Sequence, residues 1–305
     1  MIPEPSAYSG CLLGLALGDA LGAPFEGGVL ERALWRLLGS TPQGLPRWTD
    51  DTRMSLDLAE SLLACRALDP DELARRFAAS YRWSRGYGPS TARLLQRIRQ
   101  GEDWRIAAKA IHPQGSYGNG AAMRAPVVAL HCPSDLATLV HITREQARVT
   151  HAHPLGVEGA VMIAVATQGA LQHLPPADVI STVRQNLQEP KMLARVELAA
   201  RWLMGGASQQ AVIVRRELGN GIAAPDSCAT AVYIALSHFD RSFEDLLTFV
   251  RAVRGDVDTI SAMAGAIWGA RHGVCALPVT PIEARDDILA MAQRLYVQAQ
   301  HKGKV

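Results

Sequence analysis

Aromatic residues are scarce in this sequence: Phe, Trp and Tyr make up 6% of its 305 residues. Alanine, leucine and arginine recur throughout, and such a composition favours helices over sheets. An excess of charge is also lacking, because 31 lysines and arginines balance 29 acidic residues and the formal net charge is +2. This balance excludes a protein whose main role is to coat nucleic acid or an anionic membrane.

The sequence also has no closely spaced cysteine pair, and its first apolar run lacks the pattern expected of a leader segment. The five cysteines are scattered, odd in number and form no C-x-x-C pair, which argues against a disulfide framework or a zinc site and favours a reducing compartment. They are Cys11, Cys65, Cys132, Cys228 and Cys275. The apolar run from Cys11 to Ala23 has no basic segment before it and contains Asp19, so it fits neither a signal peptide nor a membrane span. We expect a cytoplasmic protein without a membrane partner.

Helical periodicity dominates what the sequence does contain. Apolar residues recur four apart after Asp51, and Asp69-Pro70-Asp71-Glu72 predicts a helix start with a capping carboxylate and proline in the first turn. Residues 154–172 predict a helix buried on most sides, and the small residues of 259–270 predict close helix packing. A last helix is predicted over 281–300.

Strand alternation, linker-like stretches, low-complexity segments and fixed-period repeats are all missing from the sequence. The simplest interpretation is an all-α protein in which residues 1–305 form a single domain.

Two acidic segments stand directly at predicted helix starts. They are Trp48-Thr49-Asp50-Asp51-Thr52 and Arg254-Gly255-Asp256-Val257-Asp258-Thr259. A lone Asp in such a place is usually a helix cap, but a cap needs one side chain and not two carboxylates with a threonine. Like charges this close repel, and an all-oxygen ligand set suits Mg²⁺, Mn²⁺ or Ca²⁺ and not zinc. Asp286-Asp287 lacks the glycine turn and the threonine, so we interpret that pair as a solvated helix face.

A glycine-rich segment, Gly115-Ser116-Tyr117-Gly118-Asn119-Gly120, is followed by Ala121-Ala122-Met123-Arg124. Three glycines in six residues allow backbone N–H groups to approach an anion closely. The segment matches neither a Walker loop nor a G-x-G-x-x-G fingerprint, and a plain loop explains the pattern equally well.

Five motifs, taken in chain order, resemble those of the ADP-ribosylglycohydrolase family, a metal-dependent family with an all-helical fold. The resemblance covers the chain from Gly10 to about Gly273. The motifs are Gly18-Asp19-Ala20-Leu21-Gly22 with Glu26 after it, Thr49-Asp50-Asp51-Thr52, Gly118-Asn119-Gly120-Ala121-Ala122-Met123-Arg124, Thr150-His151, and Gly255-Asp256-Val257-Asp258-Thr259.

Three glycine-containing stretches narrow the resemblance to the type-3 branch, which cleaves serine-linked ADP-ribose and related esters and polymers. They are Arg85-Gly86-Tyr87-Gly88, Gly115 to Gly120, and Leu218-Gly219-Asn220-Gly221-Ile222-Ala223-Ala224. The arginine-specific bacterial branch usually carries Gly-Asp-Thr where this chain has Gly88-Pro89-Ser90, so its acid is missing here. The resemblance therefore disfavours arginine-linked substrates without excluding them.

The resemblance implies a site with two Mg²⁺ ions, or Mn²⁺ in their place. Matched by position, one ion would be held by Thr49, Asp50 and Asp51, the other by Asp256 and Thr259, with Asp258 between them. The implied catalytic residues are Glu26, Asp51 and Asp258, and the implied substrate-binding residues are Gly115, Ser116, Tyr117, Gly118, Asn119, His151 and Ile222. Glu26 and the four aspartates sum to five negative charges, which two divalent ions nearly neutralise.

One departure from the family pattern lies beside the second acidic segment. Arg254 and Val257 replace a glycine and a threonine there, and a fixed cation at position 254 would weaken metal binding or contact the leaving group. Other candidates have plainer explanations: His153, before Pro154, is expected to be structural, and Trp48 and Tyr87 fit packing better than a substrate pocket.

The sequence thus predicts hydrolysis at the anomeric carbon of ADP-ribose, with no nucleic-acid role and a monomeric state. Three alternatives stay open: an inactive module that binds ADP-ribose, an arginine-linked ADP-ribosyl hydrolase, and a metal-dependent phosphohydrolase that would cut the diphosphate instead.

Overall fold

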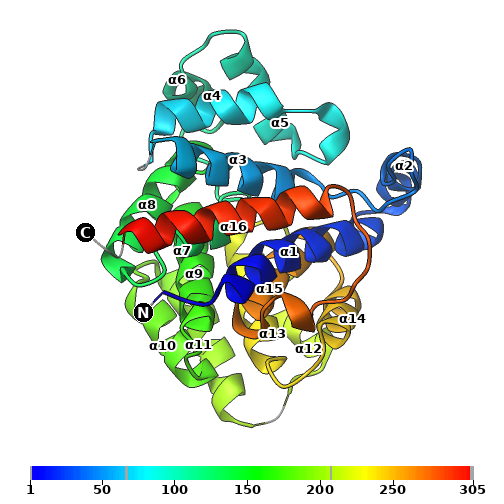
Figure 1. Cartoon of the computed structure of the whole chain (residues 1–305), viewed down its shortest axis with the longest axis vertical. Coiled ribbons are helices and arrows are strands. Elements are labelled where there is room, and N and C mark those ends of the chain that lie inside the picture. Colours follow the sequence, from blue (N-terminus) through cyan, green and yellow to red (C-terminus); the bar gives the residue numbers. More distant parts are fainter. Residues whose placement is uncertain (1, 66–67, 207, 303–305) are drawn as a thin grey trace.

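Residues 2–65, 68–206 and 208–302 are described by a computed structural model of the chain, and within them no β-strand forms (Figure 1). The all-α prediction is therefore confirmed. The helices are α1 (Pro5–Gly22), α2 (Val29–Leu38), α3 (Asp50–Cys65), α4 (Pro70–Ser80), α5 (Pro89–Arg99), α6 (Trp104–Ile111), α7 (Pro126–His131), α8 (Leu136–Arg148), α9 (Pro154–Leu171), α10 (Pro176–Gln185), α11 (Pro190–Met204), α12 (Ala211–Glu217), α13 (Ala224–Ser237), α14 (Phe243–Val253), α15 (Val257–His272) and α16 (Arg285–Lys302). Three short 3₁₀ turns are η1 (Ala23–Phe25), η2 (Trp83–Arg85) and η3 (Val274–Ala276).

Proline marks many of the helix starts. Eight of the α-helices, α1, α4, α5, α7, α9, α10, α11 and α13, carry proline in the first or second position. Proline is tolerated there because its missing N–H has no partner in the helix. At α4 the predicted start is confirmed, since the Asp69 carboxylate accepts from the backbone N–H groups of Asp71 and Glu72 at 2.9 and 3.1 Å.

The core helix is α9, which packs against α7, α8, α10, α13 and α15. By length and composition α9 could cross a membrane, but 89% of it is buried inside the fold. The prediction of a helix buried on most sides is confirmed.

Helices α1 and α15 approach each other closely along a row of glycines spaced four apart on α1. A Cβ atom added at Gly14 would lie 2.3 Å from the carbonyl oxygen of Gly265, and one at Gly18 would lie 2.2 Å from that of Ser261. Cβ atoms essentially never come this close to a neighbouring oxygen, so only glycine permits this approach. The predicted close packing of α15 is confirmed.

The antiparallel direction of this pair determines where the acidic segments meet. Because Gly22 ends α1 against Asp258 at the start of α15, the last turn of α1 lies beside the second acidic segment. Helix α3, which begins at the first acidic segment, packs against both α1 and α15. Three helix ends therefore converge on one region of the fold.

The final helix begins later than the sequence predicts, at Arg285 and not at Pro281. The N–H of Glu283 donates to the carbonyl oxygen of Pro46 at 3.0 Å, which takes this residue away from a helical hydrogen bond. Asp286 and Asp287 are exposed in the first turn of α16, as expected of a solvated helix face.

Candidate active site

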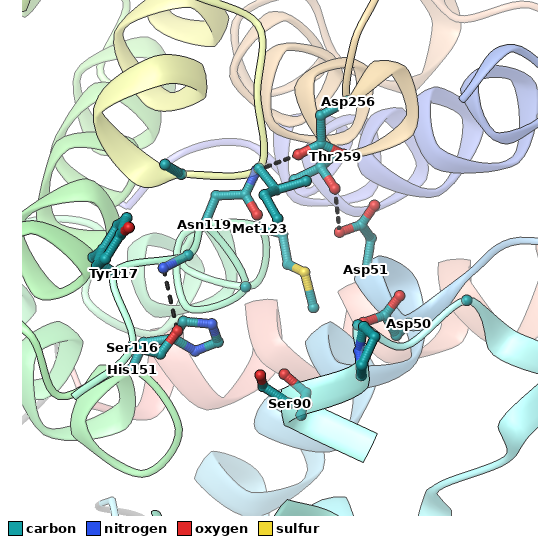
Figure 2. Close-up of a pocket in the computed structure, with 18 of the residues that line it drawn as sticks. Asp50, Asp51, Ser90, Ser116, Tyr117, Asn119, Met123, His151, Asp256 and Thr259 are labelled. Atoms are coloured by element: carbon teal, nitrogen blue, oxygen red, sulfur yellow. Dashed lines mark hydrogen bonds between the residues drawn. The ribbon is translucent and has the colours of Figure 1, made fainter. Parts of the chain in front are cut away.

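A pocket of about 420 Å³ opens where the three helix ends converge (Figure 2). Twelve of the fourteen predicted site residues line it: Glu26, Asp50, Asp51, Ser116, Tyr117, Gly118, Asn119, His151, Ile222, Asp256, Asp258 and Thr259. Gly115 and Thr49 are not among its lining residues. The two distant acidic segments and the glycine-rich loop thus share one cavity.

At the acidic end of the pocket, side chains from the two segments contact each other directly. The hydroxyl of Thr259, on α15, donates to Asp51 Oδ1, on α3, at 3.3 Å (Figure 2). The Thr49 hydroxyl, just before α3, lies 3.5 Å from Asp51 Oδ2. Asp51, Asp256 and Asp258 are 1–5% exposed, while Asp50 and Glu26 are half-buried at the pocket wall.

Asn119 connects the glycine-rich loop to the acidic end. Its side-chain Nδ2 donates to Asp256 Oδ2 at 2.5 Å (Figure 2). The same nitrogen donates to the Ser227 hydroxyl at 3.0 Å. The resemblance implies that Asn119 binds substrate, whereas its amide nitrogen is engaged in holding Asp256. Asn119 nevertheless lines the pocket.

Asp19 is a buried carboxylate at this end to which sequence reasoning assigned no role. It is 0% exposed and accepts hydrogen bonds from the Thr49 N–H at 2.9 Å and from the N–H and hydroxyl of Thr52 at 3.0 and 2.6 Å. One carboxylate oxygen each from Asp19, Asp51 and Asp258 lie within 4.8 Å of one another. In the sequence Asp19 was marked only by its place in the first motif. A single acid near a helix end does not by itself predict a metal site.

The carboxylates repel one another strongly. Burial raises the pKa of Asp51 and of Asp258 well above the usual aspartate value, and the neighbouring acids raise both further. Burial likewise raises the pKa of Asp50, helped by the nearby Asp19 and Glu26. Among the described residues that line the pocket there is no lysine or arginine to offset this charge. The donor set is all oxygen and lacks a counter-charge, so it fits hard divalent cations.

The opposite end of the pocket is built from the glycine-rich loop, which pairs with the segment before α13. The Asn119 N–H donates to the Ile222 carbonyl and the Ala224 N–H donates to the Tyr117 carbonyl, each at 2.9 Å. Tyr117 and Ile222 are 54% and 72% exposed at the mouth. Gly115 has φ +84°, and a Cβ there would lie 2.2 Å from the backbone nitrogen of His153, which explains its glycine without a substrate contact.

The two histidines that follow Thr150 have different places. His151 lines the pocket, and burial, followed by the Arg124 cation, lowers its pKa to about 3, so the ring is neutral. His153 instead caps α9, since its Nδ1 accepts the Leu155 N–H at 3.1 Å. The structural interpretation of His153 agrees with this contact.

A second wall of the pocket was not predicted as part of the site. It consists of Gly86, Gly88, Pro89, Ser90 and Thr91, which lead into the first turn of α5, with His112 and Met123 beside them. Figure 2 shows Ser90 on this turn, below the acidic residues. The proline start of α5 was visible in the sequence, but its place opposite the acidic segments depends on tertiary packing.

Trp48 and Tyr87 lie behind this wall and are absent from the pocket lining. The Arg85 guanidinium stacks 3.8 Å from the Trp48 ring and forms a bidentate ion pair with Glu283 at 2.6 and 2.7 Å. The Trp48 indole N–H donates to the Glu283 carbonyl at 3.0 Å. Trp48 therefore has a packing role, and this cluster fixes the backbone just before Thr49. Tyr87 packs edge-on against Tyr81, with the ring centroids 5.0 Å apart.

Arg254 does not have the position that its sequence suggested. It is exposed and is absent from the pocket lining, so the expectation that it weakens metal binding or contacts the leaving group has no support in the structure. Its backbone has φ +64° and ψ −167°, a conformation suited to glycine. The strain lies in the backbone that enters the second acidic segment.

We expect Arg254→Gly to stabilise the fold by about 1 kcal/mol, because relief of about 1–3 kcal/mol of backbone strain exceeds the entropy cost of glycine. Urea denaturation measures this effect. The matched control is Arg254→Ala, which removes the charge and keeps the Cβ atom, and it should gain nothing. Equal stabilisation by both variants would assign the effect to charge and contradict the strain.

Nearly the whole chain is similar to proteins of one known family. The family model for ADP-ribosylglycohydrolase matches residues 4–304. The chain is 32% identical to ADP-ribosylhydrolase ARH3 of Danio rerio, over 97% of this chain and 92% of the relative, and 32% identical to ADP-ribosylhydrolase ARH3 of Homo sapiens, over 90% and 87%.

A solved structure described as an ADP-ribosylglycohydrolase-related protein complex superimposes with a TM-score of 0.72 at 29% identity, covering 97% of this chain and 98% of that one. The predicted resemblance, including its narrowing toward the type-3 branch, is confirmed by these relatives. They support hydrolysis of ADP-ribose linkages as the class of reaction. With its fold, its motifs and nearly its full length matched, the chain belongs to the ADP-ribosylglycohydrolase family.

Proposed function

We propose that this protein is a Mg²⁺-dependent hydrolase that cleaves the bond between ADP-ribose and its acceptor. The observation that carries the proposal is the division of the pocket: one end gathers five carboxylates without a lysine or arginine, and the other end is lined by the glycine-rich loop and a neutral histidine. The first end suits metal ions and the second suits an anionic nucleotide.

The residues that would hold two Mg²⁺ ions, or Mn²⁺, are Thr49, Asp50, Asp51, Asp256, Asp258 and Thr259. When bound, the ions would supply Lewis-acid binding of the ribose hydroxyls and of the attacking water. Asp51 and Asp258 would be shared between metal binding and catalysis. Asp19, behind them, holds the backbone of Thr49 and Thr52 and so fixes the start of α3.

Glu26 is the residue we assign to proton transfer. It follows η1 at the pocket wall, and its carboxyl lies within 4.8 Å of those of Asp256 and Asp258. In the reaction the water oxygen bonds to the anomeric carbon while the bond from that carbon to the acceptor oxygen breaks. Glu26 would take a proton from the water or give one to the departing oxygen.

The diphosphate would be held without a lysine or arginine. Helix α5 directs its first turn at the pocket with no capping side chain and no acid, so its partial positive charge is free. Ser116, Tyr117 and Gly118 add the backbone of the glycine-rich loop, and Ile222 covers the mouth.

For the acceptor we propose serine, an acetyl ester or a further ADP-ribose unit. Pro89 and Ser90 line the pocket where the arginine-specific branch carries an acid, so no described residue of this turn would pair with a guanidinium leaving group. The inactive binding module loses its main argument, because Arg254 does not line the pocket. A cytoplasmic monomer remains our prediction.

The test is a hydrolysis assay on serine-linked, arginine-linked, acetylated and polymeric ADP-ribose, with Mg²⁺ and after EDTA. We expect turnover of one or more of the first, third and fourth substrates, only with metal. Release of AMP from free ADP-ribose would favour the phosphohydrolase instead, and tight binding of ADP-ribose without any turnover would favour the binding module.

Glu26→Gln should reduce turnover at least about 100-fold, the usual contribution of general acid–base catalysis, while ADP-ribose affinity by calorimetry stays close to that of the wild type. Full activity of this variant would rule out the role of Glu26.

A further inference from the structure

Arg124 is a cation that the proposed function leaves without a role. It is 0% exposed beneath the glycine-rich loop, and none of the ion pairs among the described residues includes it. Its Nε donates to Gln146 Oε1 at 2.7 Å, its Nη1 to the Gly120 carbonyl at 2.6 Å, and its Nη2 to Thr150 Oγ1 at 2.9 Å. All the hydrogen bonds of this buried guanidinium go to neutral acceptors, and it also lies 4.8 Å from the centroid of the Phe77 ring. Burial of an arginine without an ion pair is costly, so its contacts call for an explanation.

Thr150 connects this cation to the pocket, because its Oγ1 also lies 2.7 Å from His151 Nδ1. Arginine only donates, so the contact from Arg124 uses a lone pair of Oγ1. The hydroxyl has one hydrogen, and no other hydrogen bond from this hydroxyl to a described residue is present. Among the described residues Nδ1 is the one acceptor within reach of that hydrogen, and when the hydroxyl donates to it the neutral ring carries its proton on Nε2.

The Nε2 atom is the ring nitrogen that the glycine-rich loop leaves open. It has no hydrogen-bond partner within the described part of the chain, and His151 lines the pocket. A Cβ atom added at Gly118 or Gly120 would lie 3.2 or 3.0 Å from Nε2, so the two glycines keep this nitrogen uncovered. Figure 2 shows the ring beside Ser116 at the end of the pocket away from the aspartates.

We propose that Arg124 and Thr150 are positioning residues that hold His151 as the Nε2–H tautomer, so that this N–H donates to an acceptor-only oxygen of the bound ligand. Phosphate oxygens are acceptors of this kind. The inference rests on the proposed function, in which these oxygens belong to the diphosphate of ADP-ribose.

The neutral state of the ring fits the arrangement. Burial and the adjacent Arg124 cation lower the pKa of His151 to about 3, because a second positive charge beside the guanidinium is disfavoured. A single neutral tautomer thus presents one fixed donor at neutral pH.

The experiment compares Thr150→Val with the wild type. Nitrogen-15 NMR of the histidine ring reports which nitrogen carries the proton, and calorimetry with ADP-ribose in Mg²⁺ reports affinity. We expect the wild type to show only Nε2–H. Thr150→Val should lose this single tautomer and bind ADP-ribose about twofold to tenfold more weakly, since the competent fraction of the ring falls.

Two further variants separate positioning from general damage. Thr150→Ser keeps the hydroxyl and should restore both the spectrum and the affinity. Thr143→Val is the matched control, because Thr143 is buried on α8 and its hydroxyl has no hydrogen-bond partner, so neither readout should change.

A wild-type ring protonated on Nδ1 would overturn the inference, and so would Thr150→Val with unchanged ring resonances, even at weaker affinity. Failure of the wild type to bind ADP-ribose would instead contradict the proposed function, and the ring resonances would still decide the tautomer.

Discussion

Replacing Asp258 with asparagine should reduce hydrolysis by about 1,000-fold or more and at the same time stabilise the protein in EDTA. Activity falls because the predicted shared metal ligand is lost, and loss of a residue that only supports a ligand already costs 10- to 100-fold. Stability rises because burial and the neighbouring acids Glu26, Asp51 and Asp256 raise the pKa of the Asp258 carboxyl well above its usual range. Asparagine removes that charge and keeps the shape of the side chain.

The stability gained by Asp258→Asn in EDTA should depend on pH. A carboxyl whose pKa is raised by folding lowers the stability of the native state at neutral pH, and this cost disappears below the unfolded value of about 4. The gain in melting temperature of Asp258→Asn in EDTA should therefore be largest near neutral pH and vanish as the pH falls. With saturating Mg²⁺ the order should reverse, since the wild type binds metal more tightly and is stabilised by it.

The matched control is Asp287→Asn, the same change at an exposed acid in the first turn of α16. It should leave hydrolysis unchanged and shift stability by a few tenths of a kcal/mol to about 1 kcal/mol, through the helix dipole alone. An Asp258→Asn enzyme with wild-type turnover would rule out the metal-binding role, and one destabilised in EDTA would contradict the electrostatic argument.

Gly14→Ala should destabilise the fold by about 3 kcal/mol or more. The added Cβ would lie 2.3 Å from the Gly265 carbonyl oxygen. The position of a Cβ is fixed by its own backbone and the clashing oxygen is a backbone atom, so no side-chain rotation relieves the clash. Helices α1 and α15 would have to separate. Urea unfolding measures the loss, and turnover should fall in the remaining folded protein because Asp19 and Asp258 lie at the ends of these two helices.

The control is Gly221→Ala, where the nearest atom to an added Cβ is 4.0 Å away. This variant should change stability by no more than about 1 kcal/mol. Wild-type stability of Gly14→Ala would contradict the close helix contact on which the arrangement of the site depends.

Local features of the sequence predicted the fold class and several helix starts. Capping and proline rules act within one turn, so Asp69 and Pro70 identify α4 without any tertiary information. The late start of α16 was missed because Glu283 bonds to Pro46, a contact between residues far apart in the chain. Such pairings leave no periodic signal.

The candidate site divides in the same way. The two acidic segments could be identified because each concentrates more carboxylate than a helix cap needs, and the structure brings both into one pocket. Asp19 and His112 could not be identified as site residues from the sequence, because a single acid or histidine has many ordinary explanations. Arg254 was predicted to act at the site because it directly precedes the second acidic segment. In the structure it is exposed and does not line the pocket.

The glycine contact between α1 and α15 also has a consequence for synthesis of the chain. The ribosome makes α1 early, but its partner emerges only after thirteen intervening helices. Until then the glycine face of α1 and the last-turn Asp19 have no native partner on α15, so the nascent chain carries no complete acidic site. Assembly of the acidic site therefore follows translation of nearly the whole chain, and until then the glycine face of α1 stays unpaired with α15.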